Sequence, residues 1–241
     1  MFYFFNVLRY NYSMAILEVK NLSVELGGVK VLDNIGFEVN KGDVLAIIGP
    51  NGAGKTILLR SLLGLTDYSG EINWQKNVKI GYVPQRMDIE TDIPLTVEEF
   101  FYLHNSKIDE AKIKNAMKLV QLSEKILKSG LGEISVGQRQ RILVAWAALG
   151  NPDILLFDEP TADIDISGQE SIYKMIYDLQ NSGMAIILVS HDLNIVYRYA
   201  EKVLCLNRKN ICFGEPKEIL TSDQLQKLYG GEKGFYAHKH Q

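Results

Sequence analysis

The sequence predicts an α/β fold in which a mainly parallel sheet carries an additional antiparallel β patch and an inserted all-helical subdomain. Three observations support this prediction. Apolar runs such as "ILLFD" and "AIILVS" end in polar residues, as parallel strands buried on both faces do. A glycine-rich loop, "GPNGAGKT", separates another apolar run from a helical segment. Between about residues 86 and 150 the pattern is helical throughout.

The composition and charge of the chain restrict the class of protein. Of the 241 residues, 46% are hydrophobic and 23% charged, values that are ordinary for a folded globular protein. The net charge is -3 and the sequence has no basic stripe, so we expect no nucleic-acid partner. No run approaches the roughly 18–20 apolar residues that cross a bilayer.

The chain has two cysteines, Cys205 and Cys212, too few for a disulfide framework. We expect them to be reduced and to serve as small apolar fillers in neighbouring strands. The intervening "LNRKNI" also allows a hairpin that places the two opposite each other.

We interpret residues 1–13, "MFYFFNVLRYNYS", as a poorly ordered N-terminal extension; a peripheral membrane contact is the alternative. The rest is expected to be one domain. Its α/β core comprises residues 14–85 and 151–230, a helical subdomain comprises residues 86–150, and a tail comprises residues 231–241. His238 and His240 lie in the tail, and two histidines are fewer than the roughly four ligands of a structural zinc site. A solvated tail is therefore expected.

The first third of the chain contains the predicted antiparallel patch. The runs "AILEV", "LSVEL" and "IGFEV", with turn signals at "GG" and "NKGD", predict short strands between residues 15 and 39. They lead into a buried strand, "VLAIIG", at residues 44–49. After the glycine loop, "KTILLRSLLGL" predicts a helix that stops at Gly64, and "EINW" and "VKIGYVP" predict two further strands.

Helices dominate the middle of the chain. The segments "TVEEFFYLH", "DEAKIKNAMKLVQL" and "SEKILKSG" are helical, with Thr96 and Asp109 as N-caps. A further helix, "GQRQRILVAWAALG", is expected to end at Gly150. Strand "DILLFDEP", helix "SGQESIYKMIYDLQNSG", strand "AIILVSHD" and a last strand "VLCLN" then follow. This order indicates a helical insertion within an α/β core.

The glycine-rich loop fits the pattern G-x-x-x-x-G-K-[ST] between a strand and a helix. Its backbone N–H groups can turn inward around a phosphate, and the helix N-terminus adds a partial positive charge. Lys55 would pair with the β- and γ-phosphates, and the Thr56 hydroxyl would ligate Mg²⁺. The sequence therefore predicts a P-loop NTPase core of the RecA-like type that binds ATP and Mg²⁺, rather than a tight turn alone. The loop residues are Gly49, Pro50, Asn51, Gly52, Ala53, Gly54, Lys55 and Thr56.

Polar residues follow three apolar strands. Asp158 and Glu159 end "ILLFDE", and burying two carboxylates without a partner is costly. We expect Asp158 to hold Mg²⁺ and Glu159 to polarise the attacking water. Gln85 after "GYVP" would contact metal and water, and His191 after "AIILVS" would donate to the γ-phosphate. Ordinary capping or solvent exposure is the alternative for each.

The ordered set "GPNGAGKT", "GYVPQ", "ISVGQRQR", "ILLFDEPT", "DID" and "SHD" resembles the ATPase subunits of ABC transporters from about Ile16 to Gly214. The resemblance implies a head-to-tail dimer that sandwiches two ATP molecules. Each phosphate loop would face the partner copy's Ser135, Gly137 and Gln138 at a helix N-terminus. Asp165 would pass between the two sites. If the protein never dimerises, Ser135 remains a simple helix cap.

Two positions depart from the pattern of this family. Val136 stands where the family has a glycine, which constrains the loop, although the valine N–H remains available. Leu26 stands where the family has an aromatic residue that stacks on adenine. Because such stacking is worth about 1–3 kcal/mol, the substitution implies weaker ATP binding or relaxed nucleotide selectivity.

Within this family the chain is most similar to subunits of zinc and manganese importers, for example in "VLCLNRKNICFGEP". The resemblance implies a separate integral-membrane permease, an extracytoplasmic metal-binding protein as an indirect partner, and a peripheral location at the cytoplasmic face of the membrane. Residues 86–101 would line the groove that receives a permease helix, or else form core of the helical subdomain. An importer of iron, haem or siderophores and a soluble ABC ATPase without a transport role are the alternatives.

Overall fold

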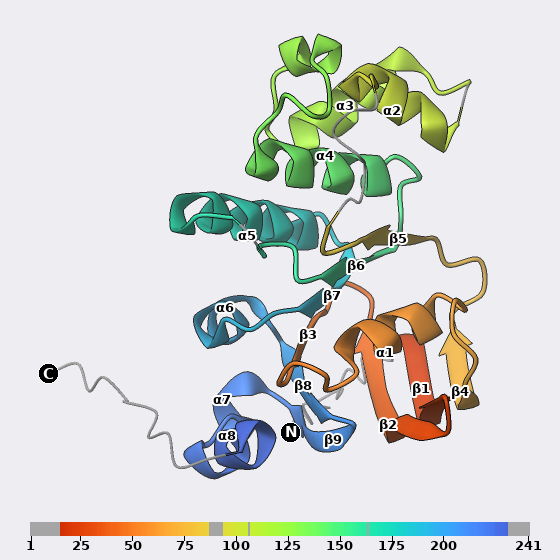
Figure 1. Ribbon diagram of the computed structural model, residues 1–241, viewed down its shortest axis with the longest axis vertical. Helices are drawn as coiled ribbons and strands as arrows, with labels where there is room; N and C mark the ends of the chain where they lie inside the picture. The colour runs from red at the N-terminus through yellow and green to blue at the C-terminus, as the bar shows by residue number, and fades with distance from the viewer. Residues whose placement is uncertain (1–14, 87–93, 106, 163, 231–241) are drawn as a thin grey trace, which may run out of the picture.

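The computed structural model describes residues 15–86, 94–105, 107–162 and 164–230. The predicted extension, the tail with His238 and His240, and part of the predicted permease groove lie outside these ranges. Figure 1 shows the described chain as an antiparallel sheet beside a central sheet, with a group of helices at one end of the molecule. Within the described residues, no helix is both long enough and apolar enough to cross a membrane.

The central sheet has six strands in the order β5-β6-β7-β3-β8-β9, and all neighbouring pairs except β8–β9 are parallel. Three of its strands, β3, β6 and β7, are buried at every position. This burial matches their continuous apolar runs, and it confirms the predicted parallel strands. The strands are β3 Val44–Ile48, β5 Ile80–Val83, β6 Ile154–Asp158, β7 Ala185–Val189, β8 Lys202–Asn207 and β9 Lys209–Gly214.

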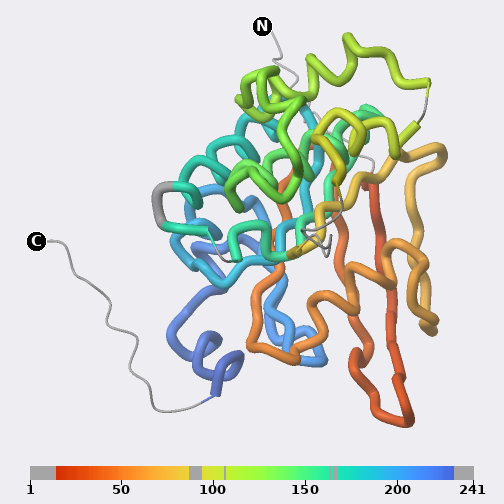
Figure 2. The backbone as a smooth tube through the Cα atoms, turned by 45° about the horizontal axis from the view of Figure 1, so that its top comes forward, coloured from red at the N-terminus to blue at the C-terminus, as the bar shows by residue number. Residues whose placement is uncertain are grey.

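The antiparallel patch is a second sheet in the order β2-β1-β4. It consists of β1 Ala15–Leu26, β2 Val29–Asn40 and β4 Ser69–Trp74. The runs "AILEV" and "LSVEL" lie in one long strand that is irregular near Asn21, where φ is 51°. Figure 2 shows β1 and β2 as a long hairpin whose turn lies far from the helical end of the molecule.

Helix α1, Lys55–Leu62, packs against both sheets, and its Leu58 and Leu59 are fully buried in a core shared with β1, β2, β3, β6 and β7. Helix α5, Ile166–Asn181, contributes to a second core with β6 and β7. Three short helices were not predicted: α6 Leu193–Tyr199, α7 Pro216–Ile219 and α8 Ser222–Tyr229.

The predicted helical block lies between β5 and β6 in the chain. It contains α2 Val97–His104, α3 Glu110–Leu119, the 3₁₀ helix η1 Glu124–Lys128 and α4 Val136–Ala148. Thr96 and Asp109 cap α2 and α3 as predicted, each accepting a backbone N–H. Val97, Phe100 and Phe101 are buried in the core around α3 and α4. These three residues therefore follow the core interpretation rather than the groove interpretation.

The β8–β9 hairpin corrects two expectations. "VLCLN" is not the last strand, because the chain turns at Arg208 and pairs with β9. This antiparallel pairing places Cys205 directly opposite Cys212, with their Cα atoms 4.9 Å apart, and the structure joins them in a disulfide. The expected reduced state is therefore contradicted, whereas the hairpin alternative and the expectation of small apolar side chains in neighbouring strands are both confirmed.

Arg208 also ties the hairpin to the two other parts of the core. Its N–H donates to the carbonyl of Ala53 in the glycine loop at 3.0 Å, and its own carbonyl accepts from the Asp33 N–H at 2.7 Å. The turn thus contacts the glycine loop on one side and strand β2 on the other.

Candidate functional site

The glycine loop connects β3 to α1 at the carboxyl end of the parallel strands. Gly52 and Gly54 have φ values of 78° and 97°, which L-residues with a side chain rarely adopt. A Cβ at Gly54 would lie 2.6 Å from Leu32 Cδ2, and one at Gly49 would lie 2.0 Å from the Leu206 carbonyl oxygen. The glycines are therefore required both by backbone conformation and by close packing beneath the loop.

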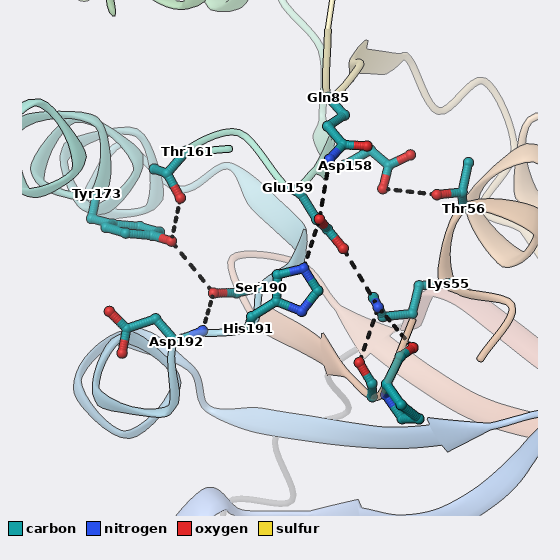
Figure 3. A network of polar contacts seen from close by, with 12 residues as sticks. Lys55, Thr56, Gln85, Asp158, Glu159, Thr161, Tyr173, Ser190, His191 and Asp192 are labelled. Atoms are coloured by element: carbon teal, nitrogen blue, oxygen red, sulfur yellow. Dashed lines mark hydrogen bonds and ion pairs between the residues drawn. The ribbon is translucent and has the colours of Figure 1, made fainter. Parts of the chain in front are cut away.

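Lys55 is the first residue of α1 and lies across the loop (Figure 3). Its Nζ donates to the carbonyl oxygens of Gly49 and Pro50 at 3.0 and 3.1 Å. The same atom lies 3.5 Å from Glu159 Oε1, while the side chain is only 6% exposed. A nearly buried ammonium with these partners provides a fixed positive charge beside the loop.

Asp158 is the last residue of β6 and is 3% exposed. The Thr56 hydroxyl donates to its Oδ1 at 3.2 Å, and the Tyr82 hydroxyl donates to its Oδ2 at 3.4 Å. Burial raises the pKa of the Asp158 carboxyl, although the hydrogen bond from Thr56 acts in the opposite direction. A carboxylate and a hydroxyl in contact are hard oxygen donors, so the donor set present here fits Mg²⁺.

Tyr82 was missed by the sequence analysis, although it stands within the "GYVPQ" motif. Burial and the neighbouring Asp158 raise its pKa to about 12, so the phenol keeps its proton at neutral pH and remains a donor. The motif alone gave no signal for this role, because the phenol meets Asp158 only where β5 and β6 lie side by side.

Glu159 follows Asp158 and has a φ of 51°, a left-handed conformation that is unusual for this residue type. Its Oε2 accepts from Gln85 Nε2 at 3.2 Å and lies 2.7 Å from His191 Nε2, while its Oε1 faces Lys55. The structure thus brings all four predicted catalytic residues together, from the ends of β5, β6 and β7 and from the start of α1 (Figure 3).

These side chains surround a pocket of about 510 Å³. Leu26, at the tip of the β1–β2 hairpin, is 45% exposed and does not line this pocket, whereas Val31 does. Gly49 and Pro50 lie behind the pocket surface with their carbonyls on Lys55. The lining residues are Val31, Asn51, Gly52, Ala53, Gly54, Lys55, Thr56, Ile57, Gln85, Glu159 and His191.

The remaining predicted residues form a second pocket, of about 550 Å³. At its edge Ser135 caps α4: its hydroxyl accepts from the Gln138 N–H at 3.2 Å, and its own N–H donates to Gln138 Oε1 at 3.0 Å. Within one copy of the chain, Ser135, Gly137, Gln138 and Asp165 therefore line a different pocket from the one at the glycine loop. The pocket is lined by Leu122, Ser135, Val136, Gly137, Gln138, Arg141, Ile164, Asp165 and Gly168.

This site is that of a P-loop nucleotide-binding α/β domain. It combines a strand, a glycine loop with its lysine, and acidic and polar residues at the ends of neighbouring strands. Comparison with known proteins gives the family. Residues 32–162 match the family described as ABC transporter. The chain therefore belongs to the ABC transporter family, among its ATP-binding subunits, which confirms the resemblance found in the motifs.

Individual relatives agree with this assignment. The chain is 36% identical to the zinc import ATP-binding protein ZnuC of Haemophilus influenzae, over 93% of this chain and 85% of that protein. It is 37% identical to the protein of the same name from Pasteurella multocida, over 94% of this chain and 88% of that one. A solved ATP-binding cassette of an ABC transporter, in its ADP conformation, has a TM-score of 0.80 at 25% identity and covers 91% of this chain and 100% of its own.

Proposed function

We propose that the chain is the ATP-hydrolysing subunit of a zinc importer and acts with a separate membrane permease. The observation that carries the hydrolytic part is the set of contacts around Glu159, where Lys55, Gln85 and His191 meet one carboxylate. The zinc assignment is supported by the relatives at 36% and 37% identity, which are zinc import proteins. Manganese remains the alternative cargo.

In this proposal the glycine loop and Lys55 bind the triphosphate. Thr56 and Asp158 would hold Mg²⁺, which when bound neutralises charge that develops on the phosphate oxygens. Tyr82 supports this function by donating to the second oxygen of Asp158, so that the carboxylate has a fixed orientation. The roles of these residues follow from hard oxygen chemistry and from their mutual contacts.

The contacts of Glu159 suggest how nucleotide binding would change the surroundings of its carboxylate. Its carboxylate is held by Lys55 and His191, the two groups that a γ-phosphate would attract. A bound triphosphate would compete for both, leaving Glu159 with Gln85 and free to accept a proton from water. His191 would then donate to a phosphate oxygen.

A second copy of the chain would complete each site. The pocket at Ser135 contains the N-terminus of the 13-residue helix α4, whose partial positive charge favours an anion. We propose that Ser135, Gly137 and Gln138 of one copy face the phosphate loop of the other, with Asp165 between the two sites. The permease and an external zinc-binding protein would complete the importer, and the chain would lie at the cytoplasmic face of the membrane.

The substitution Glu159→Gln tests the hydrolytic role, with Glu218→Gln on the exposed face of α7 as a matched control. Phosphate release from MgATP is measured with the purified full chain, alongside its size on gel filtration. We expect Glu159→Gln to lose at least about 100-fold in turnover, still bind ATP and elute as a dimer with it. Wild-type turnover in Glu159→Gln would refute the assignment.

Zinc transport is tested separately by uptake of radioactive zinc into cells that lack the gene, with and without a plasmid copy. Loss of zinc uptake that the wild-type copy restores and the Glu159→Gln copy does not would support the proposal. Normal zinc uptake in the deletion strain would refute the zinc assignment without affecting the ATPase assignment.

A further inference from the structure

Three hydroxyl groups, two of them on buried residues, form a chain beside the site (Figure 3). The Tyr173 hydroxyl lies 2.8 Å from Thr161 Oγ1 on one side and 3.4 Å from Ser190 Oγ on the other. Ser190 Oγ also accepts the backbone N–H of Asp192 at 3.1 Å. Tyr173 and Ser190 are only 4% and 3% exposed. Either hydroxyl can be the donor in each of these two contacts, so the three groups can form one continuous chain of hydrogen bonds.

This chain of hydroxyls connects segments that carry the proposed catalytic groups. Thr161 lies two residues after Glu159, in the turn where Ala162 N–H donates to the Glu159 carbonyl. Ser190 immediately precedes His191, and its backbone is fixed by a hydrogen bond to Ile47 of β3. Tyr173 lies on α5 and therefore bridges the end of β6 to the end of β7.

The turn at Glu159 needs such support. A φ of 51° for a glutamate is a strained conformation, which persists only where surrounding structure holds it. The Thr161 hydroxyl, two residues after Glu159, links this turn to α5 through its contact with the Tyr173 hydroxyl. His191 is connected to the same hydroxyl through the neighbouring Ser190, whose side chain contacts Tyr173.

We infer that Tyr173 is a positioning residue for ATP hydrolysis: its hydroxyl sets the placement of Glu159 relative to His191 through Thr161 and Ser190. Tyr173 does not line the pocket at the glycine loop and contacts no proposed phosphate ligand. Its effect should therefore appear in the chemical step and not in nucleotide binding. The inference rests on the roles proposed above for Glu159 and His191.

The test compares Tyr173→Phe, Thr161→Val and the double variant in the full chain. Tyr177→Phe is the control, because Tyr177 lies one turn further on α5, is 43% exposed and packs on Tyr199. Turnover and KM for MgATP are measured well below the melting temperature. We expect each single variant to lower kcat about tenfold, or about 1.4 kcal/mol, with KM unchanged. The double variant should lose no more than Tyr173→Phe alone, because that variant already removes the contact with Thr161 as well as the contact with Ser190.

Several results would overturn the inference. These are a Tyr173→Phe kcat within about twofold of wild type, a rise in KM at constant kcat, or single effects that multiply in the double variant. A merely structural role predicts a lower melting temperature for these variants with kcat unchanged. Suppose that wild type hydrolyses ATP and Glu159→Gln does not. A wild-type kcat for Tyr173→Phe would then refute only the positioning role of Tyr173 and leave the proposed function intact. An inactive wild-type chain would overturn the proposed function and this inference together.

Discussion

Replacing Gly49 by alanine tests how tightly the phosphate loop is packed on the central sheet. A Cβ at this position would lie 2.0 Å from the Leu206 carbonyl oxygen, whereas ordinary contacts begin at 3.4 Å. The two must therefore separate by 1.4 Å, the difference between these values. The obstacle is backbone of β8, which pairs with β3 from Leu45 to Ile48, so the clash cannot be relieved by a side-chain rotation.

The cost is estimated from overpacking, which destabilises by about 1–3 kcal/mol and occasionally by more. We take about 3 kcal/mol for this substitution, because backbone must move. At about 2–4 °C per kcal/mol for a chain of this size, Gly49→Ala should lower Tm by about 6–12 °C. Gly52→Ala is the control. A Cβ there has no neighbour within 4 Å, so only its φ of 78° is unfavourable, at about 1 kcal/mol or 2–4 °C.

The assay is thermal unfolding of the purified chain followed by circular dichroism, without nucleotide. The order of the two variants is the decisive result, because it separates packing from backbone conformation. Equal melting temperatures for Gly49→Ala and wild type would refute the reasoning. So would a larger loss for Gly52→Ala than for Gly49→Ala.

Two further substitutions probe the ligand contacts. Tyr82→Phe removes the second donor to Asp158, and we expect a several-fold higher Mg²⁺ concentration for half-maximal ATPase activity with little change in ATP binding. An unchanged Mg²⁺ dependence would show that Thr56 alone orients the carboxylate. Leu26→Tyr restores an aromatic ring at the hairpin tip, and at about 1 kcal/mol or more of stacking it should tighten ATP binding at least about fivefold. Unchanged affinity, measured by calorimetry, would indicate that the base binds elsewhere, for example against Val31.

Much of the fold was predictable because its signals are local. Strands β3, β6 and β7 are buried at every position, so each appears in the sequence as an uninterrupted apolar run between polar ends. The caps at Thr96 and Asp109 were predictable for the same reason, since an N-cap bonds within its own first turn.

Strand β9 was missed because its evidence is not local. Its positions are only partly buried or exposed, and the preceding turn uses Arg208 at a φ of 61° where a glycine or asparagine would have marked a hairpin. Helices α6 and α7 contain seven and four residues, too few for an apolar periodicity to stand out. For the same reason, the hairpin that pairs Cys205 with Cys212 could be offered from the sequence only as an alternative.

The site divides in a similar way. Residues in ordered motifs, such as Lys55 and Glu159, could be proposed from the sequence because the chemistry of phosphate binding fixes their spacing, and the structure places these two side by side. Tyr82 and Tyr173 were not, because each acts through a partner on another strand or helix. Leu26 was selected by position alone, and the structure places Val31 closer to the pocket.

The turn at Arg208 has a consequence for how this chain can be cut or rearranged. Its peptide groups form hydrogen bonds with Ala53 and Asp33. A segment late in the sequence therefore holds the glycine loop, which would bind the phosphates, against strand β2. A truncation before Arg208 would remove both hydrogen bonds even though every nucleotide-contacting motif stayed intact. Engineered splits or circular permutants should accordingly keep the hairpin whole and open the molecule elsewhere.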